Sequence, residues 1–89
     1  MGHHDITLTG RGKTKRDALN AALDEFFYEN GHRYSVSEHL GAHRLPDEPP
    51  NHMVERKQGR DTVISSEVWT DAPKDQWLQV WEFHIDFHA

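Results

Sequence analysis

Hydrophobic and polar residues alternate most regularly at the end of the chain, between residues 77 and 88. The odd positions are nearly all large and apolar: Trp77, Gln79, Trp81, Phe83, Ile85 and Phe87. The even positions become polar and ionisable along the segment: Leu78, Val80, Glu82, His84, Asp86 and His88. Because successive side chains of a strand point to opposite faces, this pattern predicts a strand with one apolar and one polar face. We expect the apolar face to anchor the core and the polar face to be available for chemistry.

Apolar residues repeat with the periodicity of a helix earlier in the chain. Apolar residues recur there at the spacing of one helix face: Leu19, Ala22, Leu23, Phe26 and Phe27. Thr14 suits the N-cap, with Asp17 three residues later, and Gly31 suits a left-handed C-terminal cap. The pattern predicts one amphipathic helix from about Lys15 to about Glu29.

Weaker alternation predicts three further strands, at residues 5–9, at 33–40 with room to extend to His43 or beyond, and at 61–69. Residues 46–60 are rich in Pro, Gly and charged residues and predict a long loop. Residues 70–76 predict the turn of a hairpin between the last two strands. We therefore expect a single α+β domain over residues 1–89. Its order is β-α-β-β-β, with a single helix packed on a three- to four-stranded antiparallel sheet.

Composition adds an expectation about partners. Only 35% of the 89 residues are hydrophobic, although three Trp, four Phe and two Tyr make that fraction bulky. A thin core often gains stability from a partner subunit, so we expect a homo-oligomer. The net charge of −5 argues against nucleic acid as a partner. The chain has no cysteine, no apolar run long enough for a membrane span and no apolar signal segment, so we expect a cytoplasmic protein.

The aromatic residues suggest a first function. Flat rings can stack on planar ligands, and they also build cores and subunit interfaces. We expect a non-catalytic binding or assembly module whose sheet forms an oligomer interface or holds a small flat ligand. The candidate contacts are Tyr34, Trp69, Trp77 and Trp81.

Ionisable residues on the last strand suggest a second function. Side chains two positions apart in a strand lie roughly 7 Å apart, a spacing at which imidazoles and carboxylates can close on one divalent metal ion. The candidate ligands are Glu82, His84 and His88, with His39 from the second strand. His43 of the same strand could contribute as well if the two strands are neighbours. The alternatives here are a metal-dependent or histidine-based enzyme and a solvated polar face.

The basic turn before the helix suggests a third function. Gly-Lys-Thr at residues 12–14 matches the end of a phosphate-binding loop, but Thr7 occupies the position of its first glycine, so nucleotide hydrolysis is not expected. Helix N-termini attract anions, and four basic residues lie here: Arg11, Lys13, Lys15 and Arg16. Anion or nucleic-acid contact and an ordinary solvated turn both stay open.

The segment from Thr9-Gly10 through Thr14 to Asp17-Ala18-Leu19-Asn20-Ala21-Ala22-Leu23 resembles the start of the dodecin family. In that family a short strand ends in Gly, and an Asp-Ala-rich helix packs on a three-stranded antiparallel sheet; the last strand here is also similar. The resemblance implies this fold, a tendency to assemble, and flavin as the cofactor. Where dodecins carry the flavin-stacking Trp, early in the second strand, this chain has Arg33-Tyr34.

Overall fold

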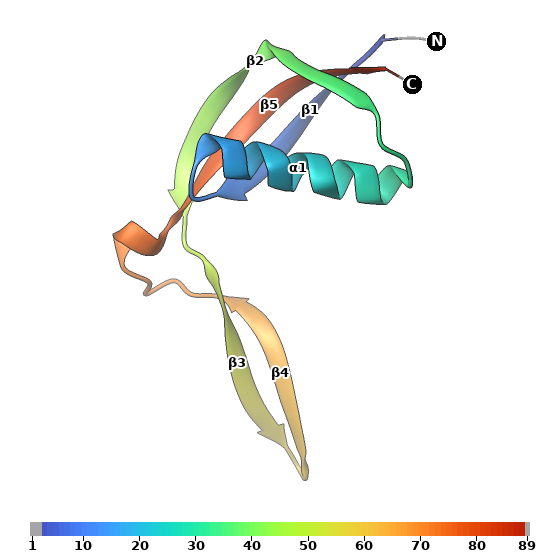
Figure 1. Ribbon diagram of the computed structural model, residues 1–89. Helices are drawn as coiled ribbons and strands as arrows, with labels where there is room; N and C mark the ends of the chain where they lie inside the picture. Colours follow the sequence, from blue (N-terminus) through green and yellow to red (C-terminus); the bar gives the residue numbers. More distant parts are fainter. Residues whose placement is uncertain (1–2, 89) are drawn as a thin grey trace.

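Strand β5 (Leu78–His88) lies at the centre of a three-stranded antiparallel sheet (Figure 1). The computed structural model describes residues 3–88 and, for residues 3 and 37–40, the backbone alone. Strands β1 (His3–Gly12) and β2 (Ser35–Glu48) flank β5, which gives the order β1-β5-β2. Helix α1 (Lys15–Asn30) connects β1 to β2 and covers one face of this sheet. The predicted α+β class is confirmed, and the predicted order β-α-β-β-β holds with one strand, β3, added.

A second sheet is inserted between β2 and β5. Strands β3 (Asn51–Gln58) and β4 (Asp61–Val68) pair with each other and contact no other helix or strand among the described residues. They project from the body of the protein as an arm, defined here as residues 51–68 (Figure 1). The molecule is consequently long and thin, 55 × 30 × 14 Å. A short 3₁₀ helix, η1 (Lys74–Gln76), lies on the return path to β5.

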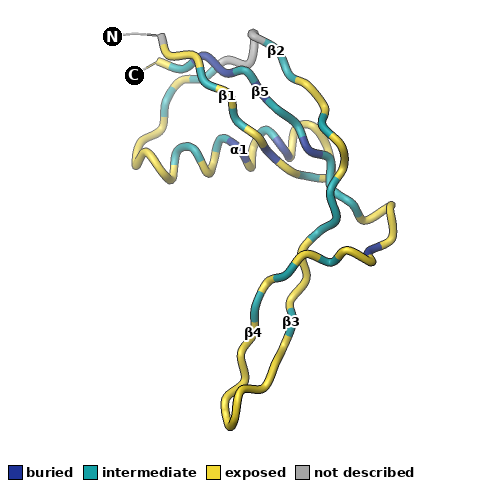
Figure 2. The backbone as a smooth tube through the Cα atoms, turned by 180° about the vertical axis from the view of Figure 1, so that it is seen from behind, coloured by how far each residue is buried: buried dark blue, intermediate teal, exposed yellow. Residues whose placement is uncertain are grey.

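The core lies between α1 and the odd positions of β5. Phe83 and Ile85 are 0% exposed and pack against Ala18 and Ala22 of the helix. Figure 2 shows the buried residues concentrated in this body, whereas the arm is exposed along almost its whole length. The predicted apolar face of the last strand is confirmed.

Two glycines allow α1 to approach β1 closely. A Cβ atom on Gly10 would lie 1.9 Å from the carbonyl oxygen of Ala18, and one on Gly12 would lie 2.7 Å from the Ala18 nitrogen. Only glycine fits at such distances from another backbone. The glycine pair at the basic turn is therefore explained by helix packing.

The helix ends as its sequence predicts. The Thr14 hydroxyl accepts a hydrogen bond from the Asp17 amide at 3.1 Å, which satisfies one of the free N–H groups of the first turn. Gly31 adopts a left-handed conformation (φ 65°) and its amide donates to the Tyr28 carbonyl.

The predicted long loop at residues 46–60 is wrong. Strand β2 runs to Glu48 and β3 begins at Asn51, so only Pro49 and Pro50 separate them. The sequence pattern does not predict the two arm strands because both of their faces are largely exposed. Such strands lack the alternation of apolar and polar residues that marks a half-buried strand. Gly59 (φ 62°) closes the tight turn between β3 and β4.

The predicted hairpin turn at residues 70–76 is also wrong. Strand β4 pairs with β3, and β5 pairs with β1 and β2, so residues 70–76 connect two different sheets. The Trp69 amide donates to the Pro50 carbonyl at 2.8 Å and closes the base of the arm. Short-range turn signals cannot distinguish a hairpin from a connection that leaves its sheet.

Candidate functional site

The face of the three-stranded sheet opposite α1, called here the open face, carries the polar positions of β5. Residues that are direct partners in the register share a face. Thr7 of β1 lies opposite His84, and Thr9 and His43 lie opposite Glu82 from the two sides. In the described part of the chain no helix or strand packs on this face. It is therefore a surface available for binding around Glu82 and His84, although Val80 and Asp86 on the same face are buried.

His84 is the centre of a loose polar cluster on the open face. Its Nε2 atom lies 3.6 Å from a carboxylate oxygen of Glu82, and its Nδ1 atom lies 3.5 Å from the hydroxyl of Thr7. The ring of His43 meets the His84 ring edge to face, with 5.4 Å between the ring centres. All four side chains reach solvent. The distances are those of a solvated cluster, at the long limit of hydrogen bonding.

The structure brings together two of the four predicted metal ligands. His84 and Glu82 are neighbours, but His88 lies at the far end of β5, opposite Ser35. The side chain of His39 lies outside the described residues. Among the side chains that the structure describes, no three His, Asp or Glu groups are arranged to hold a metal ion. His43, a further contributor that we expected only if the second and last strands are neighbours, lies beside His84. The metal site stays a prediction.

The four predicted aromatic contacts do not converge on one site. Tyr34 packs in an aromatic cluster at the C-terminal end of α1, 4.9 Å from the Phe87 ring centre. Trp69 stacks on His52 at the base of the arm, with 5.7 Å between ring centres and 7° between ring planes. Trp77 donates from its indole nitrogen to the Ala72 carbonyl at 2.8 Å. Each of these rings already has a packing partner within the chain.

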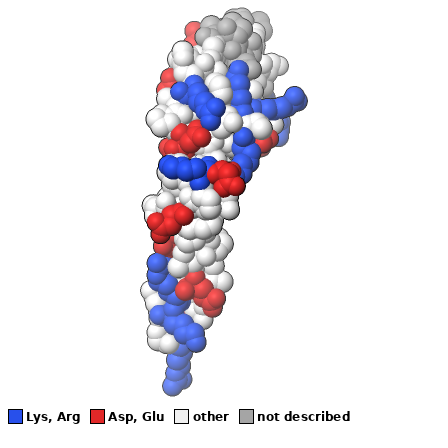
Figure 3. Space-filling view, turned by 90° about the vertical axis from the view of Figure 1, so that its left-hand side faces the viewer, with Lys and Arg blue, Asp and Glu red and all other residues white. Residues whose placement is uncertain are grey.

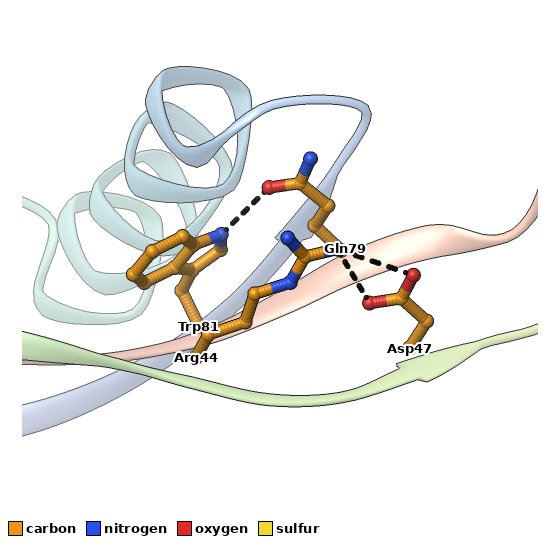
Figure 4. Close-up of polar contacts among 4 residues, drawn as sticks. All are labelled: Arg44, Asp47, Gln79 and Trp81. Carbon is orange, nitrogen blue, oxygen red and sulfur yellow. Dashed lines mark hydrogen bonds and ion pairs between the residues drawn. The ribbon is translucent and has the colours of Figure 1, made fainter.

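Trp81 lies apart from the others, on the helix side of the sheet (Figure 4). Its indole nitrogen donates to the side-chain oxygen of Gln79 at 2.9 Å, and the ammonium of Lys15 lies 5.4 Å from its ring centre. Arg44 is its register partner on β2 and forms an ion pair with Asp47 at 3.0 Å. A shallow hollow of about 460 Å³ lies on the same side, lined by residues of α1: Lys15, Arg16, Leu19 and Asn20. A half-buried ring with cations beside it can accept a flat anionic group.

The basic residues of the turn before α1 make contacts within the chain. Arg11 donates from Nε to Glu48 at 2.6 Å, and this hydrogen bond raises the pKa of Arg11. Lys13 donates to the Gln76 carbonyl at 2.9 Å, and Lys15 lies over Trp81. Arg16 lines the hollow on α1. The four predicted anion contacts thus spread over different surroundings, and anion binding stays a prediction.

The arm has a surface that the sequence analysis missed. Pairing places Met53, Ile64 and Val68 on the same face, called here the apolar arm face. Their side chains are 66%, 61% and 58% exposed. The signal becomes visible only when β3 and β4 are read in register, because Met53 lies opposite Ser66, and Ile64 lies opposite Glu55.

The other face of the arm is satisfied internally. Arg56 forms a two-pronged ion pair with Glu67, whose second bond is 3.0 Å long, and Ser65 donates to the same carboxylate at 3.1 Å. The hydrogen bond from Arg56 lowers the pKa of Glu67. His52 and Trp69 stack at the base of this face. The two faces of the arm therefore differ, and only the apolar arm face lacks such contacts among the described residues.

A hollow, called here the crook, lies at the junction between the arm and the three-stranded sheet. Its volume is about 630 Å³, and it is lined by Arg11, Glu48, Pro49, Asn51, Val68 and Leu78. Arg11 and Leu78 occupy open-face positions of the sheet, whereas Asn51 and Val68 are register partners on the apolar arm face. The crook therefore makes the open face and the apolar arm face one continuous surface.

The fold and these surfaces define a small α+β protein with a projecting β-arm. No family model, no curated protein sequence and no solved structure matches the chain. Within residues 3–88, α1 is too short and too polar to cross a membrane.

Proposed function

We propose that this protein is a non-catalytic assembly module that forms homo-oligomers through its arm. The observation that carries the proposal is the apolar arm face, where Met53, Ile64 and Val68 are each more than half exposed. A two-stranded hairpin is marginally stable by itself in water. This hairpin contacts no other helix or strand of the described chain, so a partner is the remaining source of packing.

The expected gain from covering this face is substantial. Full burial of a Val, Ile or Met side chain contributes about 1.5–3 kcal/mol, so burying the exposed parts of these three contributes roughly 3–5 kcal/mol per arm. Association costs at least about 4 kcal/mol in lost translation and rotation. Two arms buried in one contact contribute roughly 6–10 kcal/mol, which exceeds the lower end of that cost, whereas one arm alone only equals it.

The resemblance to dodecins supports the same proposal. The resemblance implies a helix packed on a three-stranded antiparallel sheet and a tendency to assemble, and β1, α1, β2 and β5 have this arrangement. In this chain the arm is inserted before the last strand. It would supply the contact surface that the thin core of the body lacks.

Sedimentation velocity over a range of concentrations tests the proposal. Ile64→Lys places a charge on the apolar arm face, and Val63→Lys places the same charge on the opposite face, where Val63 is 41% exposed. We expect the wild type and Val63→Lys to associate and Ile64→Lys to sediment as a monomer. A monomeric wild type, or equal dissociation of both variants, contradicts the proposal.

A second candidate function is the binding of a small flat anion beside Trp81. The observation that favours it is the half-buried ring with the Lys15 ammonium 5.4 Å from its centre. The resemblance to dodecins makes flavin mononucleotide the first ligand to titrate. We expect quenching of flavin fluorescence that is lost in Trp81→Ala and retained in Trp69→Ala. Equal quenching by both variants, or none by the wild type, contradicts this assignment.

A further inference from the structure

We propose that two copies exchange arms, so that the apolar arm face of each copy lies on the open face of the other copy's three-stranded sheet. This inference rests on the proposed homo-oligomer and names the surface that receives the arm. It also gives the polar face of β5 a role as an acceptor surface. Four features of the molecule support it: the continuity of the two surfaces, the length of the arm, the charges of the arm tip and the open face, and the area that the contact would bury.

Continuity comes from the crook. Because the open face and the apolar arm face meet in this hollow, a second copy can contact both surfaces at once. A two-fold axis near the crook turns one such bent surface onto another. Each copy then offers the same two surfaces, as a closed symmetric dimer requires.

Length fits this arrangement. The eight-residue strands of the arm span roughly 27 Å, and the eleven residues of β5 span roughly 37 Å. An arm laid along the open face from the crook would therefore pass Glu82 and His84 and end beside Asp86, about eight residues along β5. The register partner of Asp86 on β1 is Asp5, whose side chain is exposed.

Charge is complementary between the two surfaces. The tip of the arm carries Arg56, Lys57 and Arg60, with Asp61 beside them, and Figure 3 shows Lys and Arg gathered at this free end. Arg56 is already paired with Glu67, so Lys57 and Arg60 are the cations that can meet a partner. The open face presents the carboxylates of Asp5 and Glu82. A cationic tip on an acidic sheet favours this orientation over its reverse.

The surface area that each kind of contact would bury favours arm exchange over direct pairing of two arms. The arm face is roughly 27 Å long and about 10 Å wide for two strands, which gives about 270 Å². Stable interfaces bury about 800 Å² on each partner. Arms that pair only with each other would bury about 270 Å² on each copy. Exchange would bury one arm face and an equal area of the open face on each copy, about 540 Å², which is twice as much and closer to the area of a stable interface.

Cross-linking between single-cysteine chains tests the exchange. The natural chain has no cysteine, so each introduced thiol reports one position. Ile64→Cys marks the apolar arm face and Thr9→Cys marks the open sheet face. The two variants are purified separately, one with a mass tag, then mixed, equilibrated and treated with a flexible bismaleimide. Circular dichroism confirms that each is folded.

We expect the mixed Ile64→Cys and Thr9→Cys product to dominate. Replacing Ile64→Cys by Val63→Cys, on the other arm face, should remove most of it. If the Ile64→Cys homodimer dominates, the arms pair with each other; exchange is overturned while the proposed function stands. If the Thr9→Cys homodimer dominates, the open faces pair and exchange is again overturned. If no product forms and the wild type sediments as a monomer, both proposals are overturned.

A charge variant supplies an independent measurement. Lys57→Glu combined with Arg60→Glu should weaken wild-type association, and adding Asp5→Lys to that chain should restore part of the loss. Weakening of association by the arm changes without any restoration by Asp5→Lys contradicts the placement of the tip near Asp5.

Discussion

Gly10→Ala tests the close packing of α1 on β1. The added Cβ atom would lie 1.9 Å from the Ala18 carbonyl oxygen and 3.0 Å from the Ala22 Cβ atom. The obstacle at the shorter distance is backbone in the middle of a helix, which cannot turn aside as a long side chain can. The helix or the strand must therefore shift by more than about 1 Å to restore ordinary contact.

That shift acts on the centre of the core. Ala18 and Ala22 pack directly against Phe83 and Ile85, and a gap of 0.5–1 Å forfeits about a quarter to a half of the dispersion energy of the atoms that face it. Overpacking typically costs about 1–3 kcal/mol, and a clash with backbone belongs at the upper end or above. We expect Gly10→Ala to lose at least about 3 kcal/mol. For a domain of this size the loss corresponds to a Tm lower by about 12 °C or more.

Thermal and urea unfolding, followed by circular dichroism, measure this loss. Gly31→Ala is the matched control, because Gly31 has open space around it and only its left-handed φ of 65° opposes a side chain. That conformation costs a non-glycine residue about 1 kcal/mol. If Gly10→Ala is no more destabilising than Gly31→Ala, then α1 does not press on β1 as described, and the steric explanation of Gly10 is refuted.

Three further outcomes follow from local contacts. Thr14→Ala removes the hydroxyl that accepts from the Asp17 amide and should cost about 1 kcal/mol in urea unfolding; no measurable loss would show that the cap is not formed. The pKa of Glu67 is lowered by the hydrogen bond from Arg56, so its contribution to the arm is present above the usual value of 4.5 and is lost as pH falls through the lowered pKa. The protection factors of the β3 and β4 amides, which correct for the intrinsic exchange rate, should fall below pH 4.5, and the same pH profile in Glu67→Gln would contradict this. Gly59→Ala should likewise accelerate exchange in the arm, because φ there is 62°, while leaving β5 protected.

The body of the fold could be predicted because its residues are half-buried in a regular way. Alternation along β5 reflects one apolar face against α1 and one face that becomes polar, on which Val80 and Asp86 are also buried. The helical period reflects the single packed face of α1. Both patterns exist because a helix and a sheet that pack as two layers must each bury one face against the other. The capping residues added the helix ends, since Thr14 and Gly31 act through local backbone geometry alone.

The arm could not be predicted because it is not half-buried. A strand with both faces in solvent loses its period of two, and Pro49-Pro50 and the charged residues beside it then indicate a loop. Gly59 was the usable signal, a glycine at the head of a two-residue turn, but it becomes convincing only when the flanking strands are aligned in register.

The candidate contacts were placed less well, for a related reason. Which aromatic and ionisable residues meet depends on which strands are neighbours. The sequence supports pairing of the last two strands, whereas β5 in fact lies between β1 and β2. With this strand order, Trp69 lies at the base of the arm and Trp81 lies on the face of the three-stranded sheet that α1 covers. His43 lies beside His84 on the opposite face.

The same topology separates stability from association. The buried residues Phe83, Ile85 and Val80 all belong to β5, which pairs on both sides and needs nothing from the arm. Mutations on the apolar arm face should therefore change the association constant while leaving the core intact. On the proposal that the protein assembles through its arm, the apolar residues are divided between a core built from α1 and β5 and the exposed positions Met53, Ile64 and Val68. Under this proposal the thin core follows from the division of apolar residues between folding and assembly.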